Sequence, residues 1–212
     1  MRHLIITAAN FPAEQCSKTI GYPFELRSAD YLTTIQHALR FQNRFDSITV
    51  LETVAKQRLD YLEQAGIPVV YSNLQNDSSN KGINEVRHLW DFIKQDKFAD
   101  GDIFVKLTGR YVLLDTRILD HFMEDSEIVA KDDGDIYHPS SRGVHTFLWA
   151  FRKRFLREFI NSLDRKSSAP IEWHVKAFAR SRKARLLPSD TKLGVVTCLF
   201  LSETGLWKRA VC

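Results

Sequence analysis

The first half of the chain alternates short apolar runs with longer stretches in which apolar residues recur at helical spacing. The apolar runs predict strands at 4–9, 47–52, 67–72 and 102–108. The stretches between them predict helices over 28–45, 53–66 and 83–95. We expect Ser28 to be the N-cap of the first helix and Gly66 to close the second. This alternation is typical of parallel strands with right-handed crossovers and helices on both faces of the sheet.

The second half of the chain is richer in strands and less regular, which favours a mixed sheet. Further strands are predicted at 127–131, 135–139, 145–151, 184–188 and 192–201. Further helices are predicted over 115–123, with Asp115 as N-cap, and over 153–163 and 169–181. Without an evident linker, the 212 residues predict one α/β domain, 1–212, which could be a piece of a longer multidomain chain.

Polar residues gather directly after the third predicted strand, in the stretch NLQNDSSNKGINE, residues 73–85. In open α/β sheets the ligand lies beyond the carboxyl ends of the strands. The segments expected there are AANFP (8–12), ETV (52–54), the polar stretch and TGRY (108–111). The sequence therefore predicts a site for a polar ligand at this edge.

The composition is that of an ordinary globular protein, with a net charge of +4. Three cysteines without metal-type spacing predict reduced thiols in a cytoplasmic protein. The start of the chain lacks the pattern of a signal peptide, and no apolar run is long enough to predict a membrane span. The mild basic charge does not by itself favour nucleic acid as a partner, although basic residues cluster in FRKRFLREF (151–159) and ARSRKARLL (179–187).

Two short motifs carry candidate chemistry. In KLTGRY (106–111), Lys106 and Arg110 flank Gly109 at a strand end, where two cations and close backbone approach suit a diphosphate. In NDSS (76–79), a carboxylate and hydroxyls suit Mg²⁺ or Mn²⁺. A tight turn with surface cations explains the first motif equally well, and an Asx-turn or helix cap explains the second. Neither a dinucleotide fingerprint, a P-loop, a zincin motif nor a nucleophile elbow is found.

The segment SNKGINEVRHLWDFIK (79–94) followed by DIFVKLTGRYVLLD (102–115) resembles nucleotide-sugar-dependent glycosyltransferases of the GT-A fold. The resemblance is strongest to the N-terminal domain of a chlorella-virus glycosyltransferase that decorates the major capsid protein, and it covers mainly the first 120 residues. It implies a three-layer α/β/α sandwich with a mixed, mostly parallel sheet. It also implies a UDP-sugar donor, a glycan acceptor, transfer of L-rhamnose or glucose with retention, and a role in capsid glycan synthesis in the host cytoplasm.

The resemblance further implies a divalent cation, Mn²⁺ or Mg²⁺. Many GT-A enzymes hold the metal with an Asp-x-Asp motif after the fourth strand, where this chain has LTGR (107–110) without a carboxylate. Asp77 with Ser79 is therefore the first candidate for the metal site. Asp133-x-Asp135 is the alternative, although it is typical of a turn between strands.

The roles of the remaining candidates follow from this resemblance. Glu172, at the start of a late helix, is the candidate catalytic carboxylate, with Asp133 as a second; a first-turn carboxylate favoured by the helix dipole explains Glu172 equally well. The nucleotide is expected to contact Ala8, Ala9, Asn10, Glu52, Arg87, Lys106, Gly109 and Arg110. The acceptor is expected to contact His138, His145 and Trp149, although all three could be strand packing.

Two other function classes remain open. A nucleotidyltransferase also uses a metal and a nucleotide on an α/β sheet, but its Gly-rich phosphate loop has no counterpart in TAANFPAEQC (7–16), which lacks glycine. A nucleic-acid-binding module built on the late basic helices would show a steep dependence of binding on salt.

Overall fold

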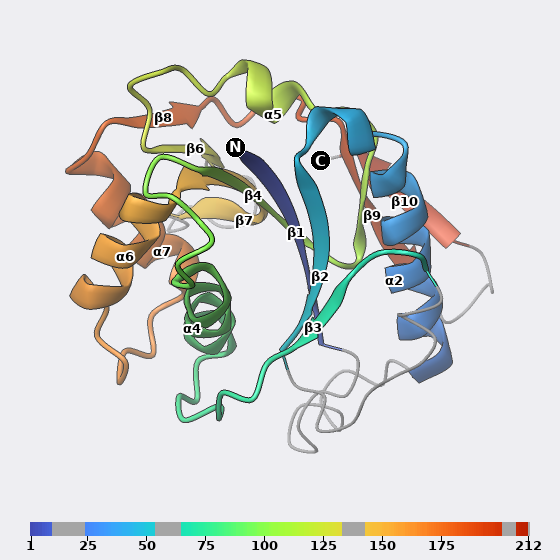
Figure 1. Ribbon diagram of the computed structural model, residues 1–212, viewed down its shortest axis with the longest axis horizontal. Helices are drawn as coiled ribbons and strands as arrows, with labels where there is room; N and C mark the ends of the chain where they lie inside the picture. The colour runs from blue at the N-terminus through green and yellow to red at the C-terminus, as the bar shows by residue number, and fades with distance from the viewer. Residues whose placement is uncertain (10–23, 54–64, 133–142, 201–206, 212) are drawn as a thin grey trace.

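The computed structural model describes residues 1–9, 24–53, 65–132, 143–200 and 207–211, and shows a central sheet between two layers (Figure 1). The sheet has seven strands in the order β3-β2-β1-β4-β7-β6-β8. Only β7 runs antiparallel to its neighbours, so the sheet is mixed and mostly parallel, as the sequence predicted. Its strands are β1 Arg2–Ala8, β2 Ser47–Glu52, β3 Val69–Tyr71, β4 Ile103–Thr108, β6 Ile128–Asp132, β7 Val144–Arg152 and β8 Ala184–Leu187.

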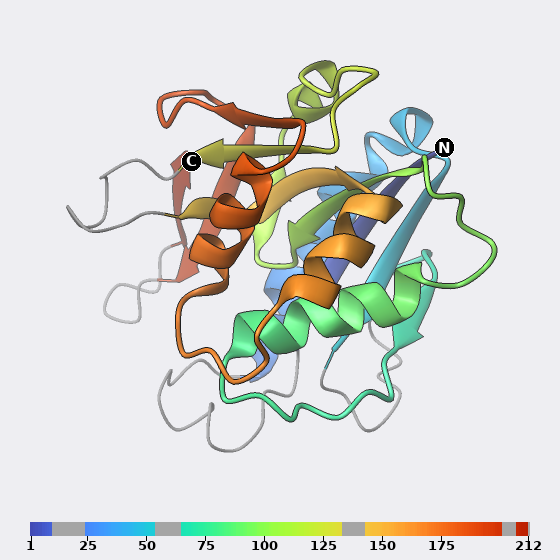
Figure 2. The ribbon, with the colours of Figure 1, turned by 90° about the vertical axis from the view of Figure 1, so that its left-hand side faces the viewer.

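Helices cover both faces of this sheet (Figures 1 and 2). One face packs against α4 Lys81–Ile93, α6 Lys153–Ser162 and α7 Ile171–Arg180. The other packs against α2 Phe24–Leu39 and the short α5 Arg117–Asp120, while a 3-10 turn, η1 Gln42–Arg44, follows α2. A second, antiparallel sheet of β5 Tyr111–Leu113, β9 Val195–Phe200 and β10 Trp207–Val211 extends the α2 layer. The three-layer α/β/α architecture is thus confirmed.

The alternation of side chains along the strands explains the two cores. Along β1, Leu4 and Ile6 enter the core under α2, whereas Ile5 enters the core under α4. A strand buried on both faces needs a nearly continuous apolar run, which is why parallel central strands are so readily predicted. No helix within the described ranges has the length and apolar composition to cross a bilayer.

Several local predictions need correction. Helix α2 begins at Phe24, so Ser28 lies inside the helix and is not its N-cap. The N-cap of α5 is Thr116, although Asp115 accepts a hydrogen bond from the Arg117 amide at 3.0 Å. Gly66 has the positive φ of 77° expected for a helix-ending glycine, but most of the helix predicted over 53–66 lies outside the described residues. The strand predicted at 135–139 also lies outside them, and β5 and β10 were not predicted.

Candidate functional site

The carboxyl ends of β1, β2 and β4 lie side by side in register. Ala8 pairs with Glu52, and Thr7 pairs with Thr108. Close backbone contacts continue beyond the strands, since the Thr53 amide donates to the Ala8 carbonyl at 2.8 Å. These three strand ends form the floor of the edge at which a ligand is expected.

Gly109 is fixed by packing on this floor. Its amide donates to the Thr7 carbonyl at 2.8 Å, and its carbonyl accepts from the Thr34 hydroxyl at 2.8 Å. A Cβ at this position would lie 2.5 Å from the Tyr31 ring and 2.8 Å from the Thr7 carbonyl oxygen. The Tyr31 hydroxyl in turn accepts from the Ala9 amide at 2.9 Å. The glycine therefore allows close contact between β1, β4 and α2, and its own amide is engaged within the protein.

The most unusual feature of this edge is a buried ion pair. Lys106, 2% exposed in the middle of an apolar strand, lies with its Nζ 2.9 Å from Glu85 Oε1 of α4. The same Nζ donates to Thr108 Oγ1 and to the Thr146 carbonyl, each at 2.7 Å. A lysine ammonium has three N–H donors, and all three are used here. A phosphate could bind Lys106 only by displacing one of these partners.

A second carboxylate is connected to the same group. Thr146, whose carbonyl accepts from Lys106, donates through its hydroxyl to Glu172 Oε1 at 2.8 Å. Glu172 lies in the first turn of α7, as predicted, and Thr146 lies on β7. The chain Glu85–Lys106–Thr146–Glu172 thus links four elements on the side of the sheet covered by α4 and α7.

The polar stretch after β3 shapes the start of α4. Asn80 is the N-cap of α4, and its side-chain oxygen accepts from the amides of Gly82 and Ile83 at 3.0 and 3.3 Å. Ser78 and Asn84 exchange two hydrogen bonds, Ser78 N to Asn84 Oδ1 at 3.2 Å and Asn84 Nδ2 to Ser78 O at 2.7 Å. Much of this polarity therefore satisfies backbone groups of a loop and a helix end.

The same stretch also holds the segment that leads into α7. The Asn80 amide group donates to the Ala169 carbonyl at 2.7 Å, and the Ser78 hydroxyl donates to the Arg165 carbonyl at 3.1 Å. A Cβ on Gly82 would lie 2.3 Å from Ile171 Cγ2, so the first turns of α4 and α7 are in direct contact (Figure 2). The loop thereby fixes Glu172 relative to Glu85.

His88 anchors the beginning of this loop to α4. The ring is 1% exposed, with Nδ1 2.6 Å from Ser72 Oγ and Nε2 2.7 Å from Asn76 Oδ1. Burial lowers the pKa of His88 below its ordinary value, and the neighbouring positive charge of Arg87 lowers it further. The surroundings of His88 therefore favour the neutral imidazole, which makes both hydrogen bonds.

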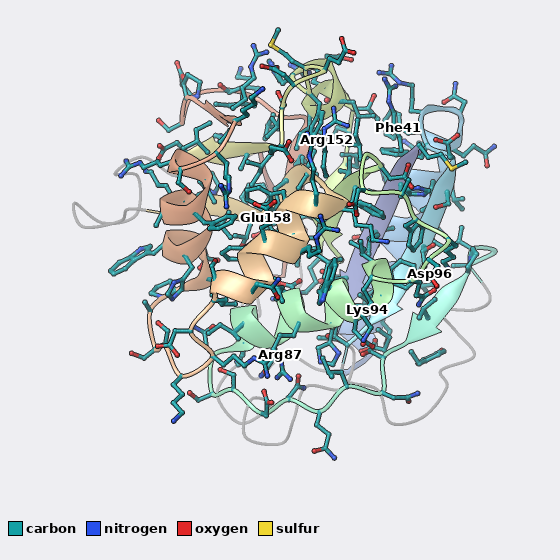
Figure 3. The ribbon with its side chains drawn as sticks, turned by 60° about the vertical axis from the view of Figure 1, so that its left-hand side comes forward. Phe41, Arg87, Lys94, Asp96, Arg152 and Glu158 are labelled. Atoms are coloured by element: carbon teal, nitrogen blue, oxygen red, sulfur yellow. The ribbon has the colours of Figure 1, made fainter. Side chains whose placement is uncertain are left out.

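The predicted metal residues lie in the loop, but they do not form a preformed metal site. Asp77, 54% exposed, makes an ion pair with Arg87, and Ser79 is exposed. Figure 3 shows Arg87 on the side of α4 that faces this loop. Among the residues that the structure describes, no three His, Cys, Asp or Glu side chains come together to hold a metal. A carboxylate already neutralised by a guanidinium is a poor metal ligand, so Asp77 and Ser79 as placed here do not fit the cation that the resemblance implies, while the alternative Asp133-x-Asp135 lies outside the described residues.

The other predicted nucleotide residues are distributed along the floor. Ala8 is buried, Glu52 is fully buried at the end of β2, and Arg110 follows Gly109 half-buried. Burial lowers the pKa of Arg87, and the positive charge of Arg165 lowers it further. Asn10 lies outside the described residues.

The two acceptor candidates that the structure describes, His145 and Trp149, are both buried. Trp149 is 1% exposed and packs against Phe151 and Phe155, so its ring is part of the core and is not open to an acceptor. His145 is buried at the edge and lies 4.8 Å from the ring of Phe147. His138 and the catalytic candidate Asp133, with Asp135, lie outside the described part of the chain.

The basic segment before and within α6 is occupied by internal contacts. Arg152 and Lys153 donate to backbone carbonyls, among them Gly101 and Phe98. Arg154 pairs with Glu127, and Arg157 pairs with Asp100. Cations that already have partners add little to an anion-binding face, which weakens the nucleic-acid interpretation.

Sequence reasoning missed Thr7, Glu85 and Thr146. A signal for Glu85 was present, since a lysine within the buried run IFVKL needs a counterion. The sequence did not show which carboxylate pairs with Lys106, because that depends on how α4 packs on the sheet.

No family model matches the chain, and no curated protein matches it in sequence. Several solved structures share its fold. A protein of Desulfovibrio desulfuricans G20, assigned as a nucleotide-diphospho-sugar transferase, has a TM-score of 0.56 and 13% identity, covering 88% of this chain and 79% of that one.

Two nucleotidyltransferases are similar to the same extent. A Bacillus anthracis protein assigned as a glucose-1-phosphate thymidylyltransferase has a TM-score of 0.55 and 10% identity, covering 93% of this chain and 89% of that one. The 4-diphosphocytidyl-2C-methyl-D-erythritol synthase of Anaerococcus prevotii has a TM-score of 0.55 and 14% identity, covering 89% and 86%. The chain therefore has the GT-A-like fold shared by nucleotide-diphospho-sugar transferases and nucleotidyltransferases.

Proposed function

We propose that this protein is a glycosyltransferase that moves a sugar from a UDP-sugar to a glycan acceptor. The observation that carries the proposal is the pair of carboxylates, Glu85 and Glu172, linked through Lys106 and Thr146 beside the carboxyl ends of β1 and β4. In this fold that edge is where a nucleotide is expected. The motif resemblance adds the UDP-sugar and the glycan, with L-rhamnose or glucose and retention of configuration as its finer part.

We assign stabilisation of the negative charge on the leaving diphosphate to arginine residues. As the bond between sugar and phosphate breaks, negative charge grows on UDP, and fixed cations stabilise it. Arg110, next to Gly109, and Arg87, midway along α4, are the candidates. To bind the diphosphate, Arg87 would exchange its ion pair with Asp77 for one with a phosphate oxygen. Lys106 acts from within the protein, since its three donors are engaged with Glu85, Thr108 and Thr146.

Glu172 is the candidate group on the acceptor side. Its Oε1 accepts from Thr146, and a carboxylate has further lone pairs with which to accept a hydrogen bond from an acceptor hydroxyl. In this role it orients the attacking oxygen and, in an inverting reaction, takes its proton. A divalent cation stays a separate prediction, and no step here depends on it, because Asp77 is paired with Arg87.

The test is a thermal-shift screen of UDP, GDP and CMP, each with and without Mn²⁺, followed by calorimetry. We expect UDP to stabilise the protein most, and Arg110→Ala to weaken UDP about tenfold while leaving uridine nearly unchanged. Arg44→Ala is the matched control, because Arg44 is a half-exposed cation paired with Asp120 at the opposite edge. Equal binding of all three nucleotides, or none, would contradict the proposal.

A product assay separates the two transferase classes. A glycosyltransferase releases UDP from a UDP-sugar, whereas a nucleotidyltransferase releases pyrophosphate from a nucleoside triphosphate and a sugar phosphate. Pyrophosphate release without UDP release would favour the nucleotidyltransferase.

A further inference from the structure

Resting on the proposed function, we propose that Glu85 binds hydroxyl groups of the donor, those of its ribose or of its sugar, and that Lys106 and Thr7 are the positioning residues that hold it. No role in ligand binding follows for Glu85 from the sequence.

One oxygen of Glu85 is held by two donors from different strands. Oε1 accepts from Thr7 Oγ1 of β1 at 2.6 Å and lies 2.9 Å from Lys106 Nζ of β4. These contacts fix the side chain of a helix residue over the ends of two neighbouring strands. Such a fixed geometry is what a binding group needs if it is to orient a ligand.

The Glu85 carboxylate also has capacity left for a ligand. A carboxylate offers about four lone-pair positions on its two oxygens, and Oε1 uses two with Thr7 and Lys106. The Glu85 side chain is 27% exposed, whereas its partner Lys106 is 2% exposed. Lys106 is therefore shielded from solvent, whereas the Glu85 carboxylate is partly accessible to a ligand.

The chemistry of the Glu85 carboxylate determines which atoms of a ligand can bind it. A carboxylate can only accept hydrogen bonds, so it offers a phosphate oxygen no donor, and the three N–H donors of Lys106 are already engaged. Hydroxyl groups donate to carboxylates in strong, charge-assisted hydrogen bonds. The polyhydroxylated part of the donor therefore suits the space above Glu85, while the diphosphate suits the arginines.

The alternative is a purely structural role, in which Glu85 serves only as the counterion of the buried Lys106. A counterion role concerns folding alone, so it predicts changed stability and unchanged affinity. A hydroxyl-binding role predicts changed affinity for ligands that carry the relevant hydroxyl.

The test compares Glu85→Gln with wild type by calorimetry, using UDP, 2′-deoxy-UDP and UDP-glucose as probes. If Glu85 binds a ribose hydroxyl, we expect the variant to bind UDP about tenfold more weakly than wild type does. Wild type should then bind 2′-deoxy-UDP about tenfold more weakly than UDP, whereas the variant should bind the two ligands with equal affinity. If it takes a sugar hydroxyl, the tenfold loss is confined to UDP-glucose. Glu158→Gln on α6, an exposed glutamate paired with Arg182, is the control and should match wild type (Figure 3).

Thr7 and Lys106 test the positioning part. Thr7→Val removes the hydroxyl while keeping the shape, and we expect it to reproduce the loss of Glu85→Gln, whereas Thr7→Ser should bind as wild type does. Lys106→Met should weaken the same ligands as Glu85→Gln does: uridine and UDP by the same factor if Glu85 binds a ribose hydroxyl, and UDP-glucose alone if it binds a sugar hydroxyl. A much larger loss for UDP would make Lys106 a phosphate ligand and overturn its positioning role.

The outcomes separate this proposal from the proposed function. Wild-type binding of UDP with unchanged affinities in folded Glu85→Gln would overturn the role of Glu85 alone. Failure of the wild type to bind both UDP and UDP-glucose would overturn the proposed function and this inference with it.

Discussion

Strands β1 and β4 carry a buried ionic cluster at each of their two ends, and the two clusters are built differently. At the amino edge, Asp102 binds the Met1 ammonium at 2.9 Å and the Ala99 amide at 2.8 Å, and it lies 3.5 Å from His3 Nε2. At the carboxyl edge, Glu85 binds Lys106 and Thr7. Both clusters join neighbouring strands, but only the second leaves its carboxylate substantially exposed.

Aromatic rings close the amino-edge cluster. His3 stacks on Phe104 with a centroid distance of 5.0 Å and meets Phe98 edge-on at 5.0 Å. The His3 and Asp102 side chains are each 7% exposed. Hydroxyl groups surround the carboxyl-edge cluster instead, and Glu85 is 27% exposed there. The amino-edge cluster therefore only joins strands within the protein, whereas the carboxyl-edge cluster also presents polar groups to solvent.

A hollow does exist at the amino edge, with a volume of about 520 Å³ and Arg2, Asp46 and Arg152 among its lining residues. Arg152 lies at the opposite end of the molecule from Arg87 (Figure 3). Its guanidinium donates to the backbone carbonyls of Gly101, Glu124 and Ser126. This hollow thus lies away from the strand ends at which ligands of this fold class are expected.

The largest effect should come from breaking the carboxyl-edge pair. Glu85→Leu leaves the charge of Lys106 buried without its counterion, and we expect a loss of about 3 kcal/mol in the free energy of unfolding, measured by urea denaturation. Adding Lys106→Met should restore most of that loss, because the orphaned charge is removed. A double variant no more stable than Glu85→Leu would show that the ion pair is not the cause.

Two glycines, one at each edge, differ in the space available for a Cβ atom. Gly109→Ala places a Cβ 2.8 Å from the Thr7 carbonyl oxygen, and backbone cannot easily yield, so we expect a loss of about 2 kcal/mol. At the amino edge, a Cβ on Gly101 meets nothing within 4 Å, so Gly101→Ala should change stability by less than about 0.5 kcal/mol. Equal urea midpoints for the two variants would mean that the carboxyl edge is less tightly packed than the structure indicates.

Removing the charge at the amino edge should affect stability but not binding. Burial acts to raise the pKa of Asp102, but the hydrogen bonds from the Met1 ammonium and the Ala99 amide outweigh it and hold that pKa below its ordinary value. Asp102→Asn weakens these hydrogen bonds, and we expect a loss of about 1 kcal/mol with unchanged UDP affinity by calorimetry. A lower affinity would show that the two edges are coupled.

The smallest effect should be a dependence of stability on pH. Burial lowers the pKa values of His3 and His88, one at each edge, below 6.5, so the unfolded chain takes up protons first as the pH falls. Stability is therefore full above about pH 6.5 and declines towards the folded pKa values. His3→Gln and His88→Gln should each flatten the decline between pH 7.5 and 5.5 in urea titrations. An unchanged slope in both would contradict the lowered pKa values.

The parallel strands were predictable because burial on both faces demands continuous apolar runs, as in LIITA and ITVLE. The start of α2 was not predictable in this way, because the first turn of the helix lies before Ser28. Serine is a common N-cap residue, but Ser28 lies inside the helix. Strand β10 pairs with the preceding strand β9 and was not predicted, whereas β5 pairs with β9 from a distant part of the chain, as Val112 with Val196. The long-range pairing of the three-residue β5 leaves little local pattern to detect.

The candidate site divides in the same way. The residue pattern alone predicted that polar residues follow the strand ends, that Gly109 stands at a strand end where close backbone approach is expected, and that Lys106 lies in a strand. The folded structure was needed to show that Gly82 contacts Ile171, that Asn80 and Ser78 hold the segment that leads into α7, that Asp77 pairs with Arg87, and that Glu85 meets Lys106. Residue type and local spacing act along the chain, whereas the partner of a buried charge is chosen by how a helix packs on a sheet.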